Sequence, residues 1–323
     1  MSNPLAEYRS EAWAMEPRAL EAFLGHLADL FQSEPVAAGL FEPDPAFKSR
    51  MTVVGGVAEI PVAGVLLKRV PAIFRRWGLE ATGYSEIVAD VKAALADKEV
   101  KVIRMRIESP GGQVAGVAEA GDAIYAARLE KNVTARIEDI GASAAYWLAA
   151  QANVISADRN AQVGSIGVYT VIADLSRAAE MQGVKIHVIS SGEHKGAGVP
   201  GSPITDRQLD GMRAVINGMA DNFIAAVAGG REVATEKVIS WATGQVWLAA
   251  DARAMGLIDS VESGLKGESG SSGVPVAATV LETKENTMSE AEKITAAAPA
   301  VATGAAVSTL PAAAPVVAAP AAI

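Results

Sequence analysis

The sequence predicts an α/β fold with a largely parallel sheet. From Met51 onwards, short apolar runs alternate with segments whose apolar residues recur at helical spacing. Strands that alternate with helices at this spacing are typical of βαβ units and hence of parallel strand pairing. Glycine-containing turns also follow several of the predicted strands. With 323 residues, the chain is long enough to bury a substantial core.

The predicted elements begin with an amphipathic helix over residues 17–32, in which Pro17 suits the first turn. A proline-rich linker follows it. The predicted strands then cover residues 57–67, 100–107, 133–137, 154–157 and 184–189. The predicted helices cover residues 85–96, 114–129, 142–152, 175–182 and 206–228, and a helix–turn–strand unit ends near Val261.

The composition changes sharply after Ser260. Residues 264–273 are rich in Gly and Ser, and residues 294–323 consist almost wholly of Ala, Pro, Val, Thr and Gly. Such segments have too little bulky apolar surface to form a packed core of their own. We therefore expect three parts: an N-terminal helical segment and linker over residues 1–45, one folded domain over residues 46–263, and a disordered tail over residues 264–323.

Composition excludes several classes of site. The absence of cysteine excludes disulfides, metal–thiolate sites and a thiol nucleophile, and three histidines are too few for a multi-histidine metal site. The net charge of −9 gives no electrostatic basis for binding nucleic acid or an anionic membrane. The sequence shows no secretory signal and no apolar run free of prolines that spans a membrane. We expect a cytosolic protein without metal or cofactor.

The candidate chemistry lies in three turns, which read SPGG at residues 109–112, GAS at 141–143 and VGSIG at 163–167. Loops at the carboxyl ends of parallel strands are where ligands bind in α/β folds. Ser143 opens a helix of small residues, where local N–H groups can stabilise a developing oxyanion. The alternatives are that Ser143 is a simple N-cap or packing residue, and that Gly111 and Gly112 form an ordinary tight turn.

A nucleophilic serine needs a base. His26 lies in the first amphipathic helix and His187 within a predicted strand, whereas His194 and Lys195 lie in the loop at residues 191–196. A lysine serves as a general base when apolar burial lowers its pKa from about 10.4 towards ~7–8. The alternative is that Lys195 is an ordinary solvated loop lysine.

Taken together, these motifs resemble the signal peptide peptidase family of Ser–Lys peptidases, a branch of the Clp/crotonase fold. The resemblance covers residues 51–262 and adds, to the three turns, IPVAGV at 60–65, the lysine loop SGEHK at 191–195, ATGQV at 242–246 and GLID at 256–259. It implies repeated ββα units. It also implies a serine peptidase that needs no cofactor.

The resemblance assigns roles residue by residue. The nucleophile falls on Ser143, the lysine base on Lys195, and a serine that orients this lysine on Ser165; the oxyanion donors fall on the N–H groups of Gly112 and Ala144, with Gly111, Gly141 and Gly164 as further substrate-loop candidates. Two positions depart from the family. Ala144 stands where many members have glycine, and Gly196 stands where aspartate often follows the lysine.

The resemblance extends to the phage and prophage branch of the family, whose members are head-maturation proteases that act inside the procapsid on scaffold and on themselves. It implies a homo-oligomeric ring, in some members with the lysine reaching a serine on the next subunit. Met288 is a candidate internal start of a scaffold segment. Two alternatives remain: a catalytically silent capsid-assembly protein with this fold, and a crotonase-like acyl-CoA enzyme. A histidine-dependent Clp triad fits less well, because residues 164–170 hold no histidine.

Overall fold

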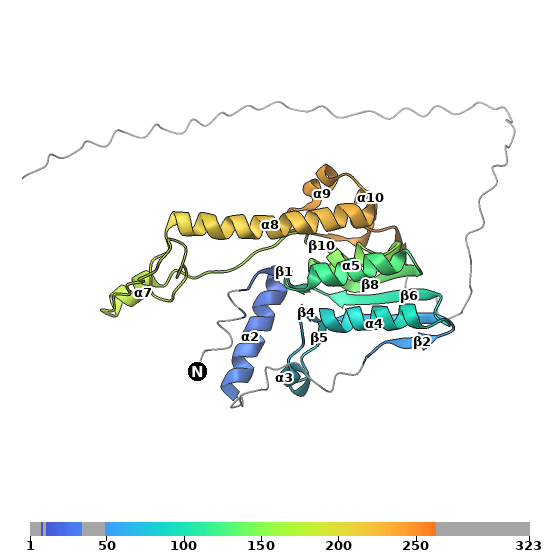
Figure 1. The fold of residues 1–323 in the computed structure, drawn as a ribbon, viewed down its shortest axis with the longest axis horizontal. Helices are drawn as coiled ribbons and strands as arrows, with labels where there is room; N and C mark the ends of the chain where they lie inside the picture. Colours follow the sequence, from blue (N-terminus) through green and yellow to red (C-terminus); the bar gives the residue numbers. More distant parts are fainter. Residues whose placement is uncertain (1–7, 9–10, 34–48, 263–323) are drawn as a thin grey trace, which may run out of the picture. The chain divides into compact units, whose positions relative to one another are not determined.

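The computed structural model describes Tyr8, residues 11–33 and residues 49–262 (Figure 1). The predicted tail, Met288 and most of the predicted linker lie outside the described residues. The helices are α2 (Pro17–Ser33), α3 (Ala72–Arg76), α4 (Tyr84–Ala96), α5 (Val117–Arg128), α6 (Ala144–Ala149), α7 (Ser176–Met181), α8 (Asp206–Arg231), α9 (Thr235–Trp241) and α10 (Ala249–Met255). The strands are β1 (Trp13–Met15), β2 (Thr52–Val54), β3 (Val57–Ala63), β4 (Val65–Leu67), β5 (Ala81–Gly83), β6 (Val102–Ser109), β7 (Gly111–Gln113), β8 (Asn132–Ala142), β9 (Val154–Asp158), β10 (Gln162–Gly164), β11 (Val246–Leu248) and β12 (Ser260–Glu262).

The larger sheet is mostly parallel, as predicted. Its strand order is β11-β10-β8-β6-β3-β2, and β9 and β12 extend it beside β8. All pairings among β3, β6, β8, β9, β10 and β12 are parallel, and only the edge strands β2 and β11 pair antiparallel. Helices α4 and α5 lie side by side against this sheet (Figure 1).

The chain repeats a ββα unit. In the first unit, β3 lies in the larger sheet, β4 lies in a smaller sheet, and the helix α4 comes later in the chain. In the second unit, β6 lies in the larger sheet, β7 lies in the smaller sheet, and the helix is α5. The smaller sheet has the order β1-β7-β4-β5. The predicted strand over residues 57–67 is therefore two strands, because Gly64 turns between them with a φ of 67°. This repeat is the Clp/crotonase-like arrangement that the resemblance implied.

Strand β6 shows how the pattern of the sequence fixes the two faces of the larger sheet. Ile103, Met105 and Ile107 alternate with charged residues and are fully buried. On the opposite face, Arg106 pairs with Glu59 at 3.4 Å and with Glu138 at 3.5 Å. One face of the sheet therefore carries the core, and the other carries ion pairs.

A second hydrophobic cluster joins α2 and α3 to the smaller sheet. Trp13, Phe23 and Phe74 are buried in it, and the ring of Phe23 meets those of Trp13 and Phe74 edge-on at 6.2 and 5.8 Å. This cluster holds β1 and the amphipathic helix α2 against the domain. The predicted helix over residues 17–32 is thus confirmed, and its apolar face packs within the same chain.

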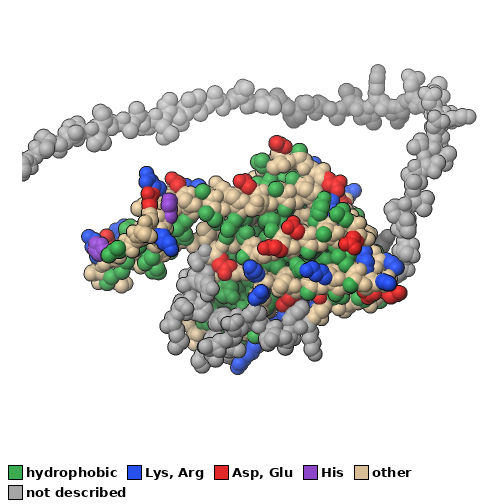
Figure 2. All heavy atoms as spheres, in the orientation of Figure 1, with side chains coloured by type: hydrophobic (Ala, Val, Ile, Leu, Met, Phe, Trp, Pro, Cys, Tyr) green, Lys and Arg blue, Asp and Glu red, His purple; other side chains and the backbone are tan. Residues whose placement is uncertain are grey.

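Residues 170–205, here called the arm, contain α7 but no strand. The predicted strand over residues 184–189 is wrong, and His187 therefore lies in an irregular segment. Among the described residues no strand pairs with this run, and most of its side chains are exposed, Ile189 to 98%. A short apolar run predicts a strand only where a neighbouring strand completes it. In the space-filling view, hydrophobic side chains lie at the surface of the arm among charged ones (Figure 2).

Helix α8 connects the arm to the core. Its N-cap is Thr205, whose side chain accepts a hydrogen bond from the N–H of Gln208 at 3.2 Å in a capping box. Its buried residues all lie in the C-terminal part, from Phe223 onwards. The N-terminal part of α8 therefore supports the arm, while the C-terminal part packs on the domain. Helix α4 begins at Tyr84, one residue before the predicted range of 85–96, and its N-cap is Gly83.

Candidate active site

Ser143 occupies a strained turn between β8 and α6. Its backbone has a φ of 55° and a ψ of −121°, a combination that is costly for a residue with a side chain. Its N–H donates a hydrogen bond to the carbonyl of Gly164 at 2.7 Å, which holds the turn in place. A strained strand-to-helix turn of this kind displays a nucleophilic serine in other hydrolases. The prediction that Ser143 opens a helix is confirmed.

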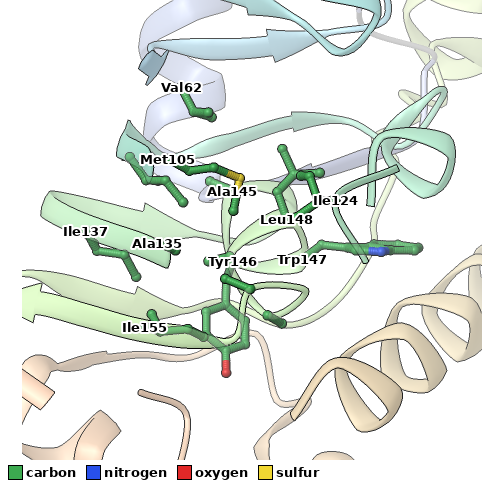
Figure 3. Close-up of a cluster of buried hydrophobic side chains, with 14 of the residues drawn as sticks. Val62, Met105, Ile124, Ala135, Ile137, Ala145, Tyr146, Trp147, Leu148 and Ile155 are labelled. Atoms are coloured by element: carbon green, nitrogen blue, oxygen red, sulfur yellow. The ribbon is translucent and has the colours of Figure 1, made fainter. Parts of the chain in front are cut away.

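The helix that follows Ser143 is embedded in the core. Tyr146 and Leu148 are fully buried and lie among side chains such as Met105 and Ile137 (Figure 3). The hydroxyl of Tyr146 donates a hydrogen bond to the carbonyl of Leu257 at 2.8 Å, and burial raises the pKa of this hydroxyl. Helix α6 is therefore fixed from several sides, which leaves the turn at its start little freedom to relax.

Gly111 and Gly112 pass so close to their neighbours that no side chain fits. A Cβ on Gly111, whose φ is 103°, lies 3.0 Å from Cβ of Ser143. A Cβ on Gly112 lies 1.8 Å from the carbonyl oxygen of Leu66 in β4. The structure thus brings this glycine turn next to Ser143.

The two predicted oxyanion donors are the N–H groups of Gly112, whose neighbour Gly111 lies next to Ser143, and of Ala144, which follows Ser143 in the chain. Gly112 lies in β7, directly after the glycine that touches Ser143. Ala144 is the first residue of α6, where N–H groups have no partner within the helix. Peptide N–H groups placed around a serine can stabilise the charge that develops during acyl transfer. The arrangement supports this role, which stays a prediction.

Ser165 belongs to the same neighbourhood. It follows Gly164, whose carbonyl holds Ser143, and it is 4% exposed with a φ of 53°. Its N–H donates a hydrogen bond to the carbonyl of Gln245 at 2.7 Å. Gly141 pairs with the strand before Ser165, β10, opposite Val163. The structure therefore brings the three predicted turns together around Ser143.

Lys195 lies outside this group of three turns. Its side chain is exposed, whereas Ser143 is 1% exposed. Among the described residues, no hydrogen bond or ion pair joins Lys195 to Ser143 or to Ser165. The lysine belongs to a tight loop in which its N–H donates a hydrogen bond to the carbonyl of Gly192 at 3.0 Å.

The loop of Lys195 rests on the first turns of α8. Glu193 pairs with Arg207 at 2.9 Å, and the ring of His194 lies beside Gly211. The indole of Trp147, one turn after Ser143, stacks on Phe223 much further along the same helix, with ring centroids 4.7 Å apart. Twelve helical residues separate these two contacts along α8, a rise of roughly 18 Å. One chain alone does not assemble the predicted dyad.

The histidines do not replace the lysine. His26 is exposed on α2, and His187 and His194 are exposed on the arm. None of them forms a hydrogen bond with Ser143 among the residues that the structure describes. The described ranges also contain no cluster of His, Asp and Glu able to hold a metal ion, and no helix in them is long and apolar enough to cross a bilayer.

One neighbour of Ser143 was missed from the sequence. Strand β1, with Trp13, Ala14 and Met15, pairs with β7 beside the serine. Its other edge meets Tyr169, whose pKa is raised to about 12 by burial and by the nearby Glu16 and Glu21. A three-residue strand is too short to show alternation, and its partner lies about a hundred positions away, so no local signal marks it.

The family comparison agrees with this geometry. Residues 126–264 match the model of Peptidase family S49. The matched range includes Ser143, Ser165 and Lys195, together with the arm that carries the lysine.

Similar proteins come from phages and from bacteria. The chain is 34% identical over 176 residues to "Capsid assembly protease C" of Escherichia phage lambda, covering 54% of this chain and 40% of that protein. It is 38% identical over 143 residues to "Head-tail preconnector protein GP5" of Enterobacteria phage P21, covering 44% and 28%. It is 30% identical over 195 residues to "Protease 4" of Haemophilus influenzae, covering 57% and 30%.

The chain thus spans less than half the length of each of these relatives. The family match covers the turns of Ser143 and Ser165 and the arm, and begins after the turn at residues 109–112. The family match, the ββα repeat and the relatives agree: residues 126–264 of this chain are similar to peptidase family S49.

Proposed function

We propose that this protein is a serine endopeptidase of phage capsid maturation, with Ser143 as nucleophile and Lys195 as general base. The observation that carries the proposal is the strained turn of Ser143, held by Gly164 and touched by Gly111. A packing serine does not need such a backbone, and strain of this kind is concentrated at functional sites.

We further propose that Lys195 acts on Ser143 of a neighbouring copy. The arm that carries the lysine has exposed apolar side chains along its length; they include Val171, Leu175, Met181, Val184, Val188, Ile189 and Val199. Apolar surface of this extent on an element without a core of its own is typical of an interaction surface. A head-to-tail contact repeated around an axis closes into a ring, in which each arm covers the next subunit.

This arrangement supplies the conditions that a lysine base needs. A lysine in bulk water stays protonated at neutral pH, whereas apolar cover favours the neutral amine. In the single chain Lys195 is exposed. Docking of the arm against the next subunit provides the cover and brings the amine to the serine in one step. Activity is then delayed until assembly.

The proposed reaction is acyl transfer. The neutral amine of Lys195 takes the proton of Ser143, whose oxygen attacks the scissile carbonyl while the N–H groups of Gly112 and Ala144 hold the oxyanion. The amine of the leaving peptide takes the proton, and water hydrolyses the acyl-enzyme. Ser165 orients the lysine. Small residues around Ser143 favour a small side chain on the acyl side of the cleaved bond.

The proposed substrates are capsid proteins of the procapsid, above all scaffold and the chain itself. The names of the phage relatives place those proteins in capsid assembly and at the head–tail connection. The Ala- and Pro-rich residues 294–323 are the candidate scaffold-like segment and a candidate cleavage target. The proposed location is the host cytoplasm and then the procapsid.

A catalytically silent assembly protein is the second candidate. The exposure of Lys195 and its absence from the serine site within one chain favour it. The two candidates differ in whether any proteolysis depends on Ser143.

Mass spectrometry of the assembled protein tests the proposal. We expect the wild-type chain, incubated at neutral pH, to shorten, and Ser143→Ala and Lys195→Met to stay intact, with rates lower by about 10³-fold or more. Lys185→Met is the matched control, because Lys185 is an exposed lysine of the same arm. It should cleave as the wild type does. Equal shortening of the wild type and Ser143→Ala would contradict the proposal and favour the silent assembly protein.

A further inference from the structure

Strand β1 is held on both edges, as a bound peptide would be. On one edge it pairs antiparallel with β7, with Ala14 opposite Gly112. Outside this pair, the N–H of Glu16 donates to the carbonyl of Pro110 at 2.9 Å, and the N–H of Val114 donates to the carbonyl of Ala12 at 3.1 Å. Since hydrogen-bonded and non-hydrogen-bonded pairs alternate, Ala14 and Gly112 face each other at a hydrogen-bonding position.

The opposite edge of the segment is also occupied. Trp13 and Tyr169 exchange two hydrogen bonds, from the N–H of Trp13 at 2.8 Å and from the N–H of Tyr169 at 3.0 Å. Tyr169 lies just beyond the turn of Ser165. The segment therefore runs between the two glycine turns that flank the candidate nucleophile. Addition of an extended strand to free sheet edges is a general mode of peptide recognition.

The bond between Ala14 and Met15 lies at Ser143. A Cβ built on Gly111 is 2.3 Å from the carbonyl oxygen of Ala14, 3.0 Å from Cα of Met15 and 3.0 Å from Cβ of Ser143. The Ala14 carbonyl oxygen, the Met15 Cα and the Ser143 Cβ therefore all lie within 3.0 Å of the position of that built Cβ. The carbonyl of Ala14 faces Gly112, the residue whose N–H was predicted to hold the oxyanion. It stands where the carbonyl of a peptide to be cleaved would stand.

Burial fits an occupied cleft. Ala14 is 0% exposed and Met15 is 2% exposed, and the neighbouring Ser143 is 1% exposed. The anchor is Trp13, whose indole N–H donates to the carbonyl of Tyr8 at 2.9 Å and whose ring packs on Phe23. No other peptide reaches Ser143 while this segment is in place.

We propose that residues 11–16 occupy the peptide-binding cleft of their own chain as a substrate-like segment, with Ala14 on the acyl side and Met15 on the leaving side. The isolated chain is thereby closed to other peptides. When the base is supplied, the oxygen of Ser143 bonds to the carbonyl carbon of Ala14, and the C–N bond to Met15 breaks. The new amino group of Met15 takes the proton, and water releases Ala14 as a carboxylate. This last step rests on the proposed function, whereas the occupancy does not.

The test of occupancy uses inactive protein, so that only binding is measured. The probe is a fluorescein-labelled peptide with the sequence of residues 11–16, Glu-Ala-Trp-Ala-Met-Glu. Its affinity for the Ser143→Ala chain is compared with that for Ser143→Ala combined with Ala14→Pro, which removes the N–H of residue 14 from the ladder. A second combination uses Trp13→Ala, which removes the anchor and keeps the ladder.

We expect the probe to bind both double variants about ten-fold or more tightly than the parent, because their own segments compete less well. Ile73→Ala is the control: it removes a buried side chain of the same cluster without touching β1 pairing, and should leave probe affinity unchanged. Thermal unfolding of every variant confirms that it is folded. If both folded variants bind the probe no better than the parent, the occupancy is refuted.

Mass spectrometry of the amino terminus separates this inference from the proposed function. In active wild type we expect a new terminus at Met15 that is absent from Ser143→Ala. Ser143-dependent cleavage elsewhere in a chain that retains residues 1–14, together with unchanged probe affinity, would overturn the inference and leave the proposed function standing. Tighter probe binding by the variants without any Ser143-dependent cleavage would support the occupancy and contradict the proposed function.

Discussion

The turn of Ser143 and the arm of Lys195 are built in opposite ways. Ser143 is held by Gly164 and precedes a helix that is buried on all sides. The arm has no buried residue in α7, and Ile189 is 98% exposed. Packing within one chain therefore places the nucleophile in the core, whereas it places the base in an exposed loop on the first turns of α8. On the proposed mechanism, the fold of one chain therefore positions the nucleophile, and assembly has to position the base.

Gly112→Ala should produce the largest combined change, in stability and in activity, because it alters the turn beside Ser143. A Cβ there falls 1.8 Å from the carbonyl oxygen of Leu66, and backbone must move to admit it. We expect the free energy of unfolding to fall by about 4 kcal/mol, with loss of peptidase activity. Urea unfolding measures the first effect.

Gly192→Ala is the matched control in the arm, where a Cβ meets nothing within 4 Å. It should change stability by less than about 0.5 kcal/mol. Similar losses for the two substitutions would mean that the arm is as tightly packed as the turn.

Trp147→Ala should cost about 3–5 kcal/mol, as removal of a large buried aromatic ring does. The indole is 3% exposed and stacks on Phe223, so its loss removes one of the contacts that hold the C-terminal part of α8 on the domain. Leu209→Ala, in the N-terminal part of the same helix and 38% exposed, should leave the midpoint of urea unfolding within experimental error. A large effect of Leu209→Ala would show that the two parts of α8 are equally buried.

Ile189→Ser tests whether the arm takes part in association between copies. The side chain contributes nothing to the packing of one chain, so we expect the thermal midpoint at low protein concentration to stay unchanged. If the arm docks on a neighbour, the same substitution loses the burial of one large apolar side chain, about 1.5–3 kcal/mol, and weakens association about ten-fold or more. Sedimentation velocity over a range of protein concentrations measures the strength of this association. Unchanged association would remove Ile189 from the interface.

Asp259→Asn should have the smallest effect, and one that depends on pH. Burial alone would raise the pKa of Asp259, but hydrogen bonds from Arg231 and from the N–H of Ile155 outweigh it and lower the pKa below its usual range. A lowered carboxyl pKa stabilises the fold above the unfolded value of about 4, and this stability is lost as pH falls through the folded pKa.

We therefore expect Asp259→Asn to lower stability by about 1 kcal/mol at pH 7, with no difference from the wild type once the carboxyl is protonated in acid. The matched arm variant is Glu193→Gln, in an exposed pair with Arg207. Urea unfolding should show no effect for it at either pH. An equal, pH-independent loss for Asp259→Asn would contradict the ion-pair account.

Elements with a clear period could be predicted from the sequence. The helix over residues 17–32 and the strand over 100–107 correspond closely to α2 and β6, because each has a long apolar face that the core covers. The helix over residues 206–228 corresponds to α8, of which the core covers only the C-terminal part. The run at 184–189 has the same kind of residues and no strand, because no strand among the described residues pairs with it. The local sequence pattern therefore shows that a segment is apolar, but it does not show which part of the fold, if any, packs on that segment.

The candidate site shows the same limit. The three turns around Ser143 could be anticipated because glycines and serines at strand ends mark them, and the structure brings them together. The short strand at Trp13 could not, since its pairing with β7 depends on contacts between distant parts of the chain. The separation of Lys195 from Ser143 likewise follows from tertiary packing of the arm on α8, which no spacing in the sequence reveals.

The most direct test mixes two inactive variants, Ser143→Ala and Lys195→Met, unfolds them together and reassembles them. If the lysine of one copy serves the serine of the next, a random equal mixture places an intact serine beside an intact lysine in about a quarter of the interfaces of a head-to-tail ring. We predict that peptidase activity returns to roughly that fraction of the wild-type rate. A mixture that assembles as the wild type does, yet stays as inactive as either variant alone, would contradict the account.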